Sequence, residues 1–541
     1  MTEYQNNLLT LMKRVDAFLR ANNIRYYLLG GSMIGAMRHK GYIPWDDDFD
    51  IMIGRKDFNR LVEMSGDLGV DDLEFDCFEN DPYFSKPYGM FSRTNDTCTS
   101  SSRIFWGGKC MGTAIDVFVL DDMNSRDKEE FIHALLLHQE VMSKVKIYKD
   151  EIIRYKDEYL EYKDREKKEG KAAIVKELRD NLISFASGEC DTRVVTTWGM
   201  KLRDYPYEWI DEPKLVPYED AMFPVPTKPE ACLRLQYGYN WYMIPETTEQ
   251  VEHNFYQNDS LSYNNYYADI DHFIDWDEAY AVLDERKRIK VDTLEANKNK
   301  AKFHNEIAAN AALMRYEEIA ESERIAMAES GRHVEFLESM EQLFVKRNWF
   351  TTAGISNAIS DEIAIIWISE LVYAGRYFDA MKVRSIFLSK EAAGSSNDTL
   401  KLLDKVITLA EVYQDHDMDG IKAALGAIPE EAQNHLPDCI LAKGRLLDGD
   451  YTDKKAIGDL ITVCREHLND YPNNYDIQKM LGDLLWETGD KDEAMDLYKV
   501  VNDKSRNGLD LLDLSERFGM TAGYLSSIIS AEDDDEEEDE E

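Results

Sequence analysis

The spacing of apolar residues near the N-terminus predicts an amphipathic helix followed by a short strand. Within residues 4–22 the apolar positions share one helical face, formed by Leu8, Leu11, Met12, Val15, Phe18 and Leu19. Residues 24–29 then form a short, mostly apolar run that is typical of a strand. Residues 48–53 begin with acidic and apolar residues in alternation, and residues 115–120 are apolar except for Asp116, so both predict strands. Helix and strands together predict a mixed α/β domain.

The polar pattern changes three times farther along the chain. Residues 125–187 lack proline and are highly charged, which predicts a helical insertion with a solvated surface. Residues 205–245 hold seven of the thirteen prolines, so we expect a compact, irregular lobe rather than regular helices. Residues 275–347 have no proline and one glycine, which predicts long helices that act as a connector.

From about residue 350 the pattern predicts pairs of helices joined by recurring turns. The turns are GRYFDAM at 375–381, GDYTDKKAI at 449–457 and GDKDEAM at 489–495, each before an alanine-bearing helix. The stretch LGDLLWETGDKDEAMDLYKVV resembles a tetratricopeptide repeat, and such repeats commonly bind a partner protein. An ordinary helical bundle is the alternative.

These patterns divide the 541 residues into four segments. We expect an α/β domain at 1–265, a helical connector at 266–348, an all-α helical-repeat region at 349–530, and a disordered acidic tail at 531–541. The fold class is therefore an α/β domain with a helical insertion at 125–187, followed by an all-α region.

Charge and cysteine usage exclude several classes of protein. The formal charge is −42, from 63 basic and 105 acidic residues, which disfavours nucleic acid and anionic lipid as partners. The seven cysteines form no CxxC pair, so no zinc knuckle or dithiol site is expected. There is no signal peptide pattern and no apolar run long enough to span a membrane. We therefore expect a cytoplasmic protein.

Candidate chemistry gathers in the segment GGSMIGAMRHKGYIPWDDDFD at 30–50. Gly30, Gly31 and Ser32 lie where a strand meets a helix, a place where backbone can approach a phosphate. On a strand Asp48 and Asp50 share one face, so both carboxylates can converge on a divalent metal. The alternative for these aspartates is a solvated acidic turn.

Two further residues add to this site. Asp116 lies in the apolar run AIDVFVL, and a buried carboxylate is costly unless it is paired or binds metal. It is therefore a candidate third ligand and a candidate base for an acceptor hydroxyl. The alternative is a structural ion pair with Arg93 or Arg38. Arg38 is also a candidate cation beside a phosphate.

The segment GSMIGAMRHKGYIPWDDDFDI resembles the signature of the LicD family of phosphocholine transferases, within the nucleotidyltransferase superfamily. AIDVFVLDD resembles the later acidic strand of that family, and the lobe resembles its C-terminal part. The resemblance covers roughly residues 1–260. It implies Asp48, Asp50 and Asp116 as catalytic metal ligands, Asp46 as a further ligand, and Gly31 and Ser32 near the donor phosphates.

The resemblance implies an enzyme of the LicD type that uses Mg²⁺ or Mn²⁺. We expect transfer of phosphocholine, or a similar phospho-substituent, from a CDP-linked donor such as CDP-choline to a glycan hydroxyl. Such a reaction would serve lipopolysaccharide or teichoic acid biosynthesis. The alternatives are nucleotidyl transfer to a protein or small molecule, and a helical-repeat scaffold with a degenerate enzyme domain.

Overall fold

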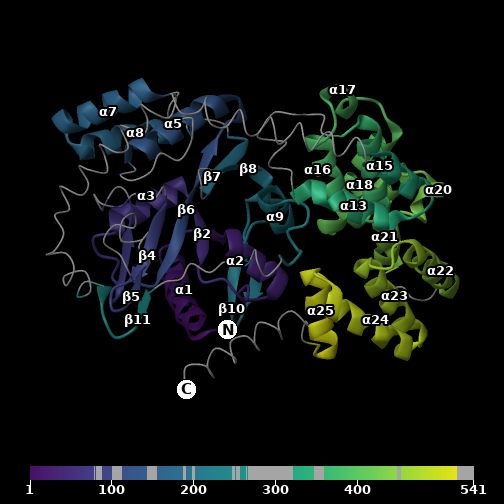
Figure 1. Cartoon of the computed structure of the whole chain (residues 1–541). Coiled ribbons are helices and arrows are strands. Elements are labelled where there is room, and N and C mark those ends of the chain that lie inside the picture. Colours follow the sequence, from purple (N-terminus) through teal and green to yellow (C-terminus); the bar gives the residue numbers. More distant parts are fainter. Residues whose placement is uncertain are drawn as a thin grey trace, which may run out of the picture. The chain divides into compact units, whose positions relative to one another are not determined.

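The chain forms two compact units (Figure 1). Unit 1 comprises Met1–Tyr237 and Pro245–Asn297, and unit 2 comprises Gly238–Ile244 and Lys298–Glu541. The computed structural model describes residues 1–77, 80, 84, 88–99, 112–142, 155–186, 190–197, 201–245, 250, 256–263, 265, 321–345, 359–447 and 453–520.

Unit 1 is built on a seven-stranded mixed sheet. Its strands run in the order β1-β2-β6-β4-β3, and β7 and β8 extend the sheet from β6. β2 and β6 are parallel, and the other pairs are antiparallel. The strand bounds are β1 Tyr26–Leu28, β2 Asp50–Gly54, β3 Leu73–Asp76, β4 Gly89–Arg93, β6 Ala114–Met123, β7 Thr192–Thr197 and β8 Lys201–Pro206. The three predicted strands correspond to β1, β2 and β6.

Helices α1 (Glu3–Ala21) and α3 (Arg55–Met64) pack on one face of this sheet. Phe18 of α1 lies edge-on to Phe91 of β4, with 5.9 Å between the ring centroids. Since Phe91 and Met90 alternate along β4, Met90 belongs to the opposite face. Asp116 is the register partner of Met90, so its side chain also lies on the face opposite α1 and α3.

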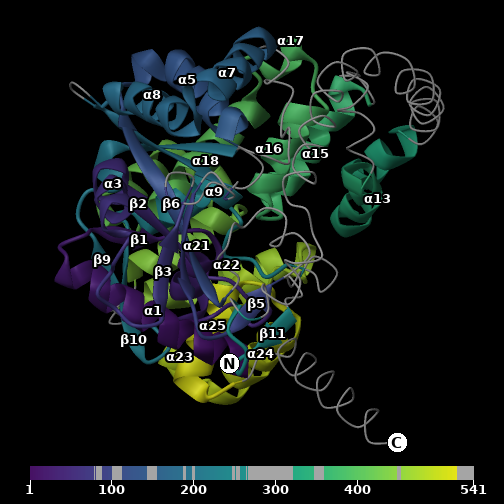
Figure 2. The same cartoon turned by 90° about the vertical axis from the view of Figure 1, so that its left-hand side faces the viewer.

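The predicted helical insertion is present between β6 and β7. Its described residues contain a short turn and three helices: η2 Ser125–Asp127, α5 Lys128–Met142, α7 Lys156–Glu169 and α8 Lys171–Ser184. The three helices lie together at one end of the sheet in both views (Figure 1 and Figure 2). Phe131 and Leu135 of α5 and Leu182 of α8 share a buried cluster with Met123 and Val194 of the sheet.

The prediction of an irregular lobe at 205–245 is wrong in part. This region contains η4 Tyr207–Trp209, the hairpin β9 Lys214–Tyr218 with β10 Ala221–Val225, and helix α9 Pro229–Tyr237. Prolines fit these elements because Pro229 opens α9, where its missing N–H is harmless. Pro217 and Pro224 lie in a two-stranded hairpin, whose strands are both edges. A second small sheet pairs β5 Thr97–Thr99 with β11 Tyr256–Asn258.

Unit 2 is all-helical in the part that the structure describes, which confirms the predicted all-α region. The predicted turns at 375–381 and 489–495 lead into α16 and α24, whereas most of the turn predicted before α22 lies outside the described residues. The tetratricopeptide class itself stays a prediction. The helices are α13 His333–Val345, α15 Asp361–Tyr373, α16 Tyr377–Ile386, α17 Lys390–Ala393, α18 Asp398–Gln414, α19 Met418–Ala427, α20 Glu430–Gln433, α21 Pro437–Leu447, α22 Lys454–Asp470, α23 Tyr475–Thr488, α24 Lys491–Lys504 and α25 Gly508–Phe518.

The short segment Gly238–Ile244 is held inside unit 2 by its backbone. The N–H of Ile244 donates to the carbonyl of Arg506 over 2.8 Å, and the N–H of Gly508 donates to the carbonyl of Tyr242 over 3.0 Å. Gln414 donates to the carbonyl of Tyr239 over 3.0 Å. The Tyr239 ring also packs against that of Tyr377, with centroids 5.8 Å apart. This segment is therefore an integral part of the helical unit.

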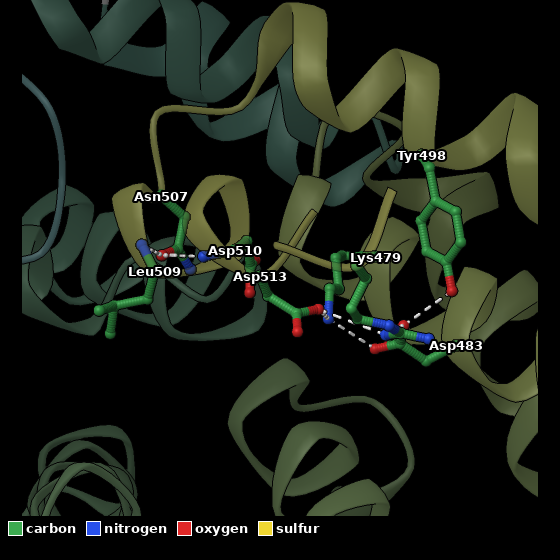
Figure 3. A network of polar contacts seen from close by, with 8 residues as sticks. Lys479, Asp483, Tyr498, Asn507, Leu509, Asp510 and Asp513 are labelled. Atoms are coloured by element: carbon green, nitrogen blue, oxygen red, sulfur yellow. Dashed lines mark hydrogen bonds and ion pairs between the residues drawn. The ribbon is translucent and has the colours of Figure 1, made fainter. Parts of the chain in front are cut away.

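A network of charged side chains links α23, α24 and α25 (Figure 3). Lys479 contacts Asp483 at 2.8 Å and Asp513 at 2.5 Å, and its side chain is mostly buried. The hydroxyl of Tyr498 donates to Asp483 over 2.8 Å, and Arg517 contacts the same carboxylate at 2.8 Å. Burial opposes the charge on Lys479, yet the carboxylates around it raise its pKa overall. The ion pairs therefore link α23 to α25, and the Tyr498 hydrogen bond adds α24 to the network.

Some predictions fall on residues outside the described ranges. The predicted acidic tail at 531–541 lies there, as does most of the predicted connector at 266–348. Within the described part of that connector, α13 is helical. None of the helices in the described ranges combines the length and apolarity needed to cross a membrane. The finer domain boundaries stay a prediction.

Candidate active site

The Gly-Gly-Ser turn lies directly after β1, at the start of the short helix α2 (Gly30–Ile34). Gly30 has a φ of +59°, which a residue with a side chain rarely adopts. Gly31 lies against the carboxylate of Asp46, so a Cβ at that position would be 2.5 Å from Oδ2. The two glycines thus have different roles: Gly30 makes the turn, and Gly31 leaves room for Asp46.

Ser32 connects the turn to the acidic strand. Its hydroxyl oxygen accepts a hydrogen bond from the backbone N–H of Asp50 over 2.8 Å. Both residues are buried. Since the oxygen accepts, the hydroxyl hydrogen is still available to donate to another acceptor. The bond also fixes the start of β2 relative to α2.

Asp50 and Asp116 are direct register partners on the parallel strands β2 and β6. The pairing continues one residue beyond β2, because the N–H of Asp116 donates to the carbonyl of Phe49 over 3.0 Å. Partners in register lie about 4.8 Å apart and point to the same face. The structure therefore brings together two of the predicted ligands, from segments that are far apart in the sequence.

Phe49 explains the orientation of the aspartates on either side of it. Its ring is fully buried and packs against Tyr42, Tyr218 and Phe223, with centroid distances of 6.0, 5.2 and 5.7 Å. Asp50 alternates with Phe49, so its carboxylate lies on the other side of the backbone. The aromatic cluster thus fixes the strand rotation that places Asp50 beside Asp116.

The donor set of the site suits a hard cation in its chemistry. Asp46, Asp48, Asp50 and Asp116 supply oxygen atoms alone, and Mg²⁺ and Mn²⁺ prefer such ligands. Their side chains are not gathered around one point, because no three His, Cys, Asp or Glu side chains of the described residues converge as a metal ion requires. Asp50 and Asp116 are the two that the strand register brings to one place.

The predicted cation Arg38 is buried and lies in the short π-helix η1 (Gly35–His39) that follows α2. Its Nε donates to Nδ1 of His39 over 3.4 Å. Burial, with a smaller effect of the Arg38 charge, lowers the pKa of His39 to about 3. His39 is therefore neutral at physiological pH and adds no positive charge to the site.

Sequence reasoning missed two side chains that hold the acidic segment from outside. Gln5 of α1 donates to three backbone carbonyls in residues 43–46. Glu219, in the β9–β10 turn, accepts from the N–H of Tyr42 over 3.1 Å. The pattern Thr2-x-x-Gln5 is a recognisable helix-capping signal, but it says nothing of the contact with the acidic segment.

Three tyrosines that the sequence did not indicate also lie near the aspartates. Burial is the largest cause of the raised pKa of Tyr42 and Tyr218. The pKa of Tyr237, a residue at the end of α9 that is 42% exposed, is raised by partial burial and then by the charges of Asp50, Asp46 and Asp48, in that order. These phenols stay protonated at physiological pH and can donate hydrogen bonds. The lobe therefore contributes Tyr237 to the surroundings of the acidic site.

Comparison with known proteins matches this region to one family. The family model described as "LicD/FKTN/FKRP, nucleotidyltransferase domain" covers residues 23–95. Residues 23–95 form a LicD-family domain. This domain contains the Gly-Gly-Ser turn and three of the four predicted acidic ligands, whereas Asp116 lies beyond the matched residues.

The curated relatives of the LicD-family domain are similar to this chain over short stretches. The "Lipopolysaccharide cholinephosphotransferase LicD" of Haemophilus influenzae is 41% identical over 64 residues, which are 12% of this chain and 24% of the relative. An uncharacterised protein of Rickettsia prowazekii is 47% identical over 58 residues, 11% of this chain and 22% of the relative. The human "Ribitol 5-phosphate transferase FKRP" is 44% identical over 52 residues, 10% of each chain.

The chain thus spans about a quarter or less of the length of the curated relatives that it matches. No solved structure matches it significantly. The similarity therefore concerns the LicD-family domain, and the activity of the whole chain is a separate question.

Proposed function

We propose that unit 1 transfers a phosphate-containing substituent, phosphocholine first among them, from a CDP-linked donor to a hydroxyl of a cell-surface glycan. The observation that carries the proposal is the register pairing of Asp116 with Asp50, which lies within the residues that match the LicD-type model. The names of two relatives support the reaction class, since one is a cholinephosphotransferase and the other a ribitol 5-phosphate transferase.

The proposal includes a divalent metal, Mg²⁺ or Mn²⁺, held by Asp50 and Asp116 together with Asp48 and Asp46. Such an ion neutralises phosphate charge and stabilises a leaving oxygen when it is bound. Gly31 and Ser32 are the proposed contacts of the donor phosphates. The Ser32 hydroxyl can donate to a phosphate oxygen while its own oxygen holds the Asp50 amide.

The proposed transfer is a single displacement at phosphorus. The acceptor hydroxyl oxygen forms a bond to the phosphorus that carries choline, and the bond from that phosphorus to the bridging oxygen breaks. CMP leaves with the bridging oxygen and its electron pair. Asp116 accepts the hydroxyl proton and later releases it to solvent, which is the role of a general base. The products are CMP and a glycan phosphodiester.

The test is a screen of CDP-linked donors for CMP release with Mg²⁺ and a glycan acceptor. CDP-choline, CDP-ribitol and CDP-glycerol are the first donors to compare. Asp50→Asn and Asp116→Asn should each lower turnover by a factor of at least about 10², because each removes charge from the reacting centre. Asp157→Asn, at an exposed position of α7, is the matched control and should retain full turnover. Full activity in both site variants would refute this assignment.

Two other functions would release no CMP in this screen, and nucleoside triphosphates added as further donors separate them from each other. A nucleotidyltransferase would consume a nucleoside triphosphate and release diphosphate, leaving the nucleotide on the acceptor. A scaffold with a degenerate enzyme domain would release neither CMP nor diphosphate. In either case the helical unit 2 would be the proposed site for a protein partner, as it is in the main proposal.

A further inference from the structure

Gln5 occupies a position that a helix cap alone does not explain. It is the third residue of α1, whose N-cap is Thr2. The N–H of Thr2 donates to Oε1 of Gln5 over 2.9 Å, and the N–H of Gln5 donates to Oγ1 of Thr2 over 3.1 Å. This reciprocal capping box occupies the side-chain oxygen. The amide nitrogen of Gln5 is left to bond elsewhere, and the residue is only 3% exposed.

That nitrogen donates to the backbone just before the acidic strand. Its acceptors are the carbonyls of Asp46 at 2.9 Å, Pro44 at 3.2 Å and Ile43 at 3.3 Å. An amide nitrogen carries two hydrogens, so at least one of them is shared between two carbonyls. The same residues form a turn, since the N–H of Asp46 donates to the carbonyl of Ile43 over 2.9 Å. One buried side chain therefore fastens a whole turn to α1.

The opposite end of this loop is fixed by Glu219. Its carboxylate accepts from the N–H of Tyr42 over 3.1 Å, and its N–H donates to the carbonyl of Lys40 over 2.7 Å. Gly41 makes room for this contact, because a Cβ there would lie 2.1 Å from Oε1 of Glu219. The backbone is thus held on one side by Glu219 and on the other by Gln5.

The position of the Asp46 carboxylate depends on how the backbone of this loop is held. Its Oδ2 lies so close to Gly31 that a Cβ on the glycine would be 2.5 Å away. A small shift of the backbone at Asp46 would therefore change how its carboxylate meets the Gly-Gly-Ser turn. Asp48 follows two residues later and leads into β2. Gln5 sets the backbone position from which both carboxylates project.

We propose that Gln5 is a positioning residue for the proposed metal site, which it serves by fixing the backbone of residues 43–46 through its amide nitrogen. This inference rests on the proposed function, because it assigns Gln5 to the same acidic site. It predicts that the hydrogens on that nitrogen matter to metal affinity, and that the capping oxygen does not. Residues that orient metal ligands commonly change affinity by about 10- to 100-fold when they are replaced.

The experiment measures Mn²⁺ binding to the full-length chain by titration calorimetry and by electron paramagnetic resonance. Gln5→Glu keeps the size and the capping oxygen but turns the donor into an acceptor that faces three carbonyls. Gln5→Met, which cannot bond to the carbonyls but leaves them without a facing charge, is the second variant should Gln5→Glu fail to fold. Thr2→Ala is the matched control, since it breaks the capping box and keeps the amide contacts. Thermal unfolding is recorded for each protein.

We expect the Gln5 variants to bind Mn²⁺ at least about tenfold more weakly than the wild type. Thr2→Ala should lower the unfolding temperature yet keep its Mn²⁺ affinity within about twofold, because the loop contacts persist. Folded Gln5 variants with wild-type affinity would overturn the inference and leave the proposed function intact. A Thr2→Ala protein that loses as much affinity would also overturn it, since the helix cap would then explain the effect. A wild-type chain that binds no Mn²⁺ would instead refute the metal site itself.

Discussion

The hydroxyl oxygen of Ser32 accepts a hydrogen bond from the backbone N–H of Asp50 over 2.8 Å. Eighteen positions of chain separate the two residues, and the bond joins the glycine turn to the first residue of the acidic strand. Both partners are almost fully buried, so no water is at hand to replace the serine oxygen. The turn and the strand therefore depend on each other.

This dependence predicts the effect of Ser32→Ala. The Asp50 amide would lose its acceptor in a buried place, which typically costs about 1–3 kcal/mol of the free energy of unfolding. Turnover should fall as well, because the start of β2 carries a proposed metal ligand. Hydrogen exchange of the Asp50 amide and CMP release measure the two effects.

Ser32→Thr keeps the oxygen and is the control for Ser32→Ala. It adds a methyl group in a packed site, so some loss of stability is expected, but the Asp50 amide should stay protected from exchange. If the Asp50 amide exchanges its hydrogen as slowly in Ser32→Ala as in the wild type, the bond from Ser32 does not hold the start of the strand.

The sequence predicted the parts of the site that follow from local pattern. Alternation along 48–53 predicts that Asp50 points away from Phe49 and Ile51, and the structure pairs Asp50 with Asp116 on neighbouring strands. The strand rotation has a further cause, the packing of Phe49 against Tyr218 and Phe223, that no local pattern reveals. The first turn of α1 carries a visible capping signal, yet the second use of Gln5 depends on tertiary folding.

The lobe shows a different limit of sequence reasoning. Its prolines pointed to irregular structure, but proline is compatible with the first turn of α9 and with the edges of the β9–β10 hairpin. Residues 238–244 continue the same aromatic stretch and yet belong to the helical unit. Its tertiary contacts distinguish this segment from the lobe before it, among them the hydrogen bonds with Gln414, Arg506 and Gly508.

Buried His138 predicts that unit 1 loses stability in mild acid. Burial lowers the pKa of His138 from 6.5 to about 3, and the positive charge of Arg55 adds to this effect. Below pH 6.5 the unfolded chain therefore binds a proton that the folded chain does not, so the free energy of unfolding falls as pH falls toward 3. His39 acts in the same direction.

His138→Gln should remove this contribution. Between pH 6 and pH 5 the decrease in the free energy of unfolding should be shallower by about 1 kcal/mol per pH unit, since one proton corresponds to about 1.36 kcal/mol per unit. Hydrogen exchange of β6, corrected for its intrinsic pH dependence, reports on unit 1. His435→Gln, at an exposed position, should leave the slope unchanged. An unaltered slope in His138→Gln would show that His138 is protonated in the folded chain.

Asp438 predicts the opposite pH response in unit 2. Its Oδ2 is fully covered and has no hydrogen-bond partner among the described residues. Burial, with a smaller effect of the Asp476 charge, raises the pKa of Asp438 from 3.8 to about 8. The folded chain therefore holds a proton that the unfolded chain releases above pH 3.8. The stability that this proton provides is lost as pH rises through 8.

Asp438→Asn should accordingly stabilise unit 2 more at pH 8 than at pH 4. Scanning calorimetry of the full chain should show the transition of unit 2 raised by a few degrees at pH 8, where the wild type must keep a proton on a buried carboxyl group. Asp419→Asn is the control, because the Asp419 side chain is 99% exposed. An equal shift of the transition at both pH values would mean that Asp438 does not titrate in this range.

Gly238 is the first residue of the segment Gly238–Ile244 in unit 2, and both its backbone conformation and its surroundings require glycine. Its φ is +96°, and a Cβ there would lie 2.6 Å from the ring of Phe378. Gly489 has a similar φ of +102° but no atom within 4 Å of such a Cβ. The two residues lie in the same unit and differ in steric surroundings, so they form a matched pair.

Gly489→Ala should cost about 1–2 kcal/mol, the usual penalty for a left-handed residue with a side chain. Gly238→Ala should cost more, because the backbone or the Phe378 ring must also move. Protection of the Tyr239 and Ile244 amides against hydrogen exchange should fall in Gly238→Ala and persist in Gly489→Ala, since the strain acts on the held segment. Gly238→Ala combined with Phe378→Ala should recover part of the loss, because the smaller side chain removes the clash. Equal costs for the two single variants would show that Phe378 yields freely, and that φ alone requires glycine at 238.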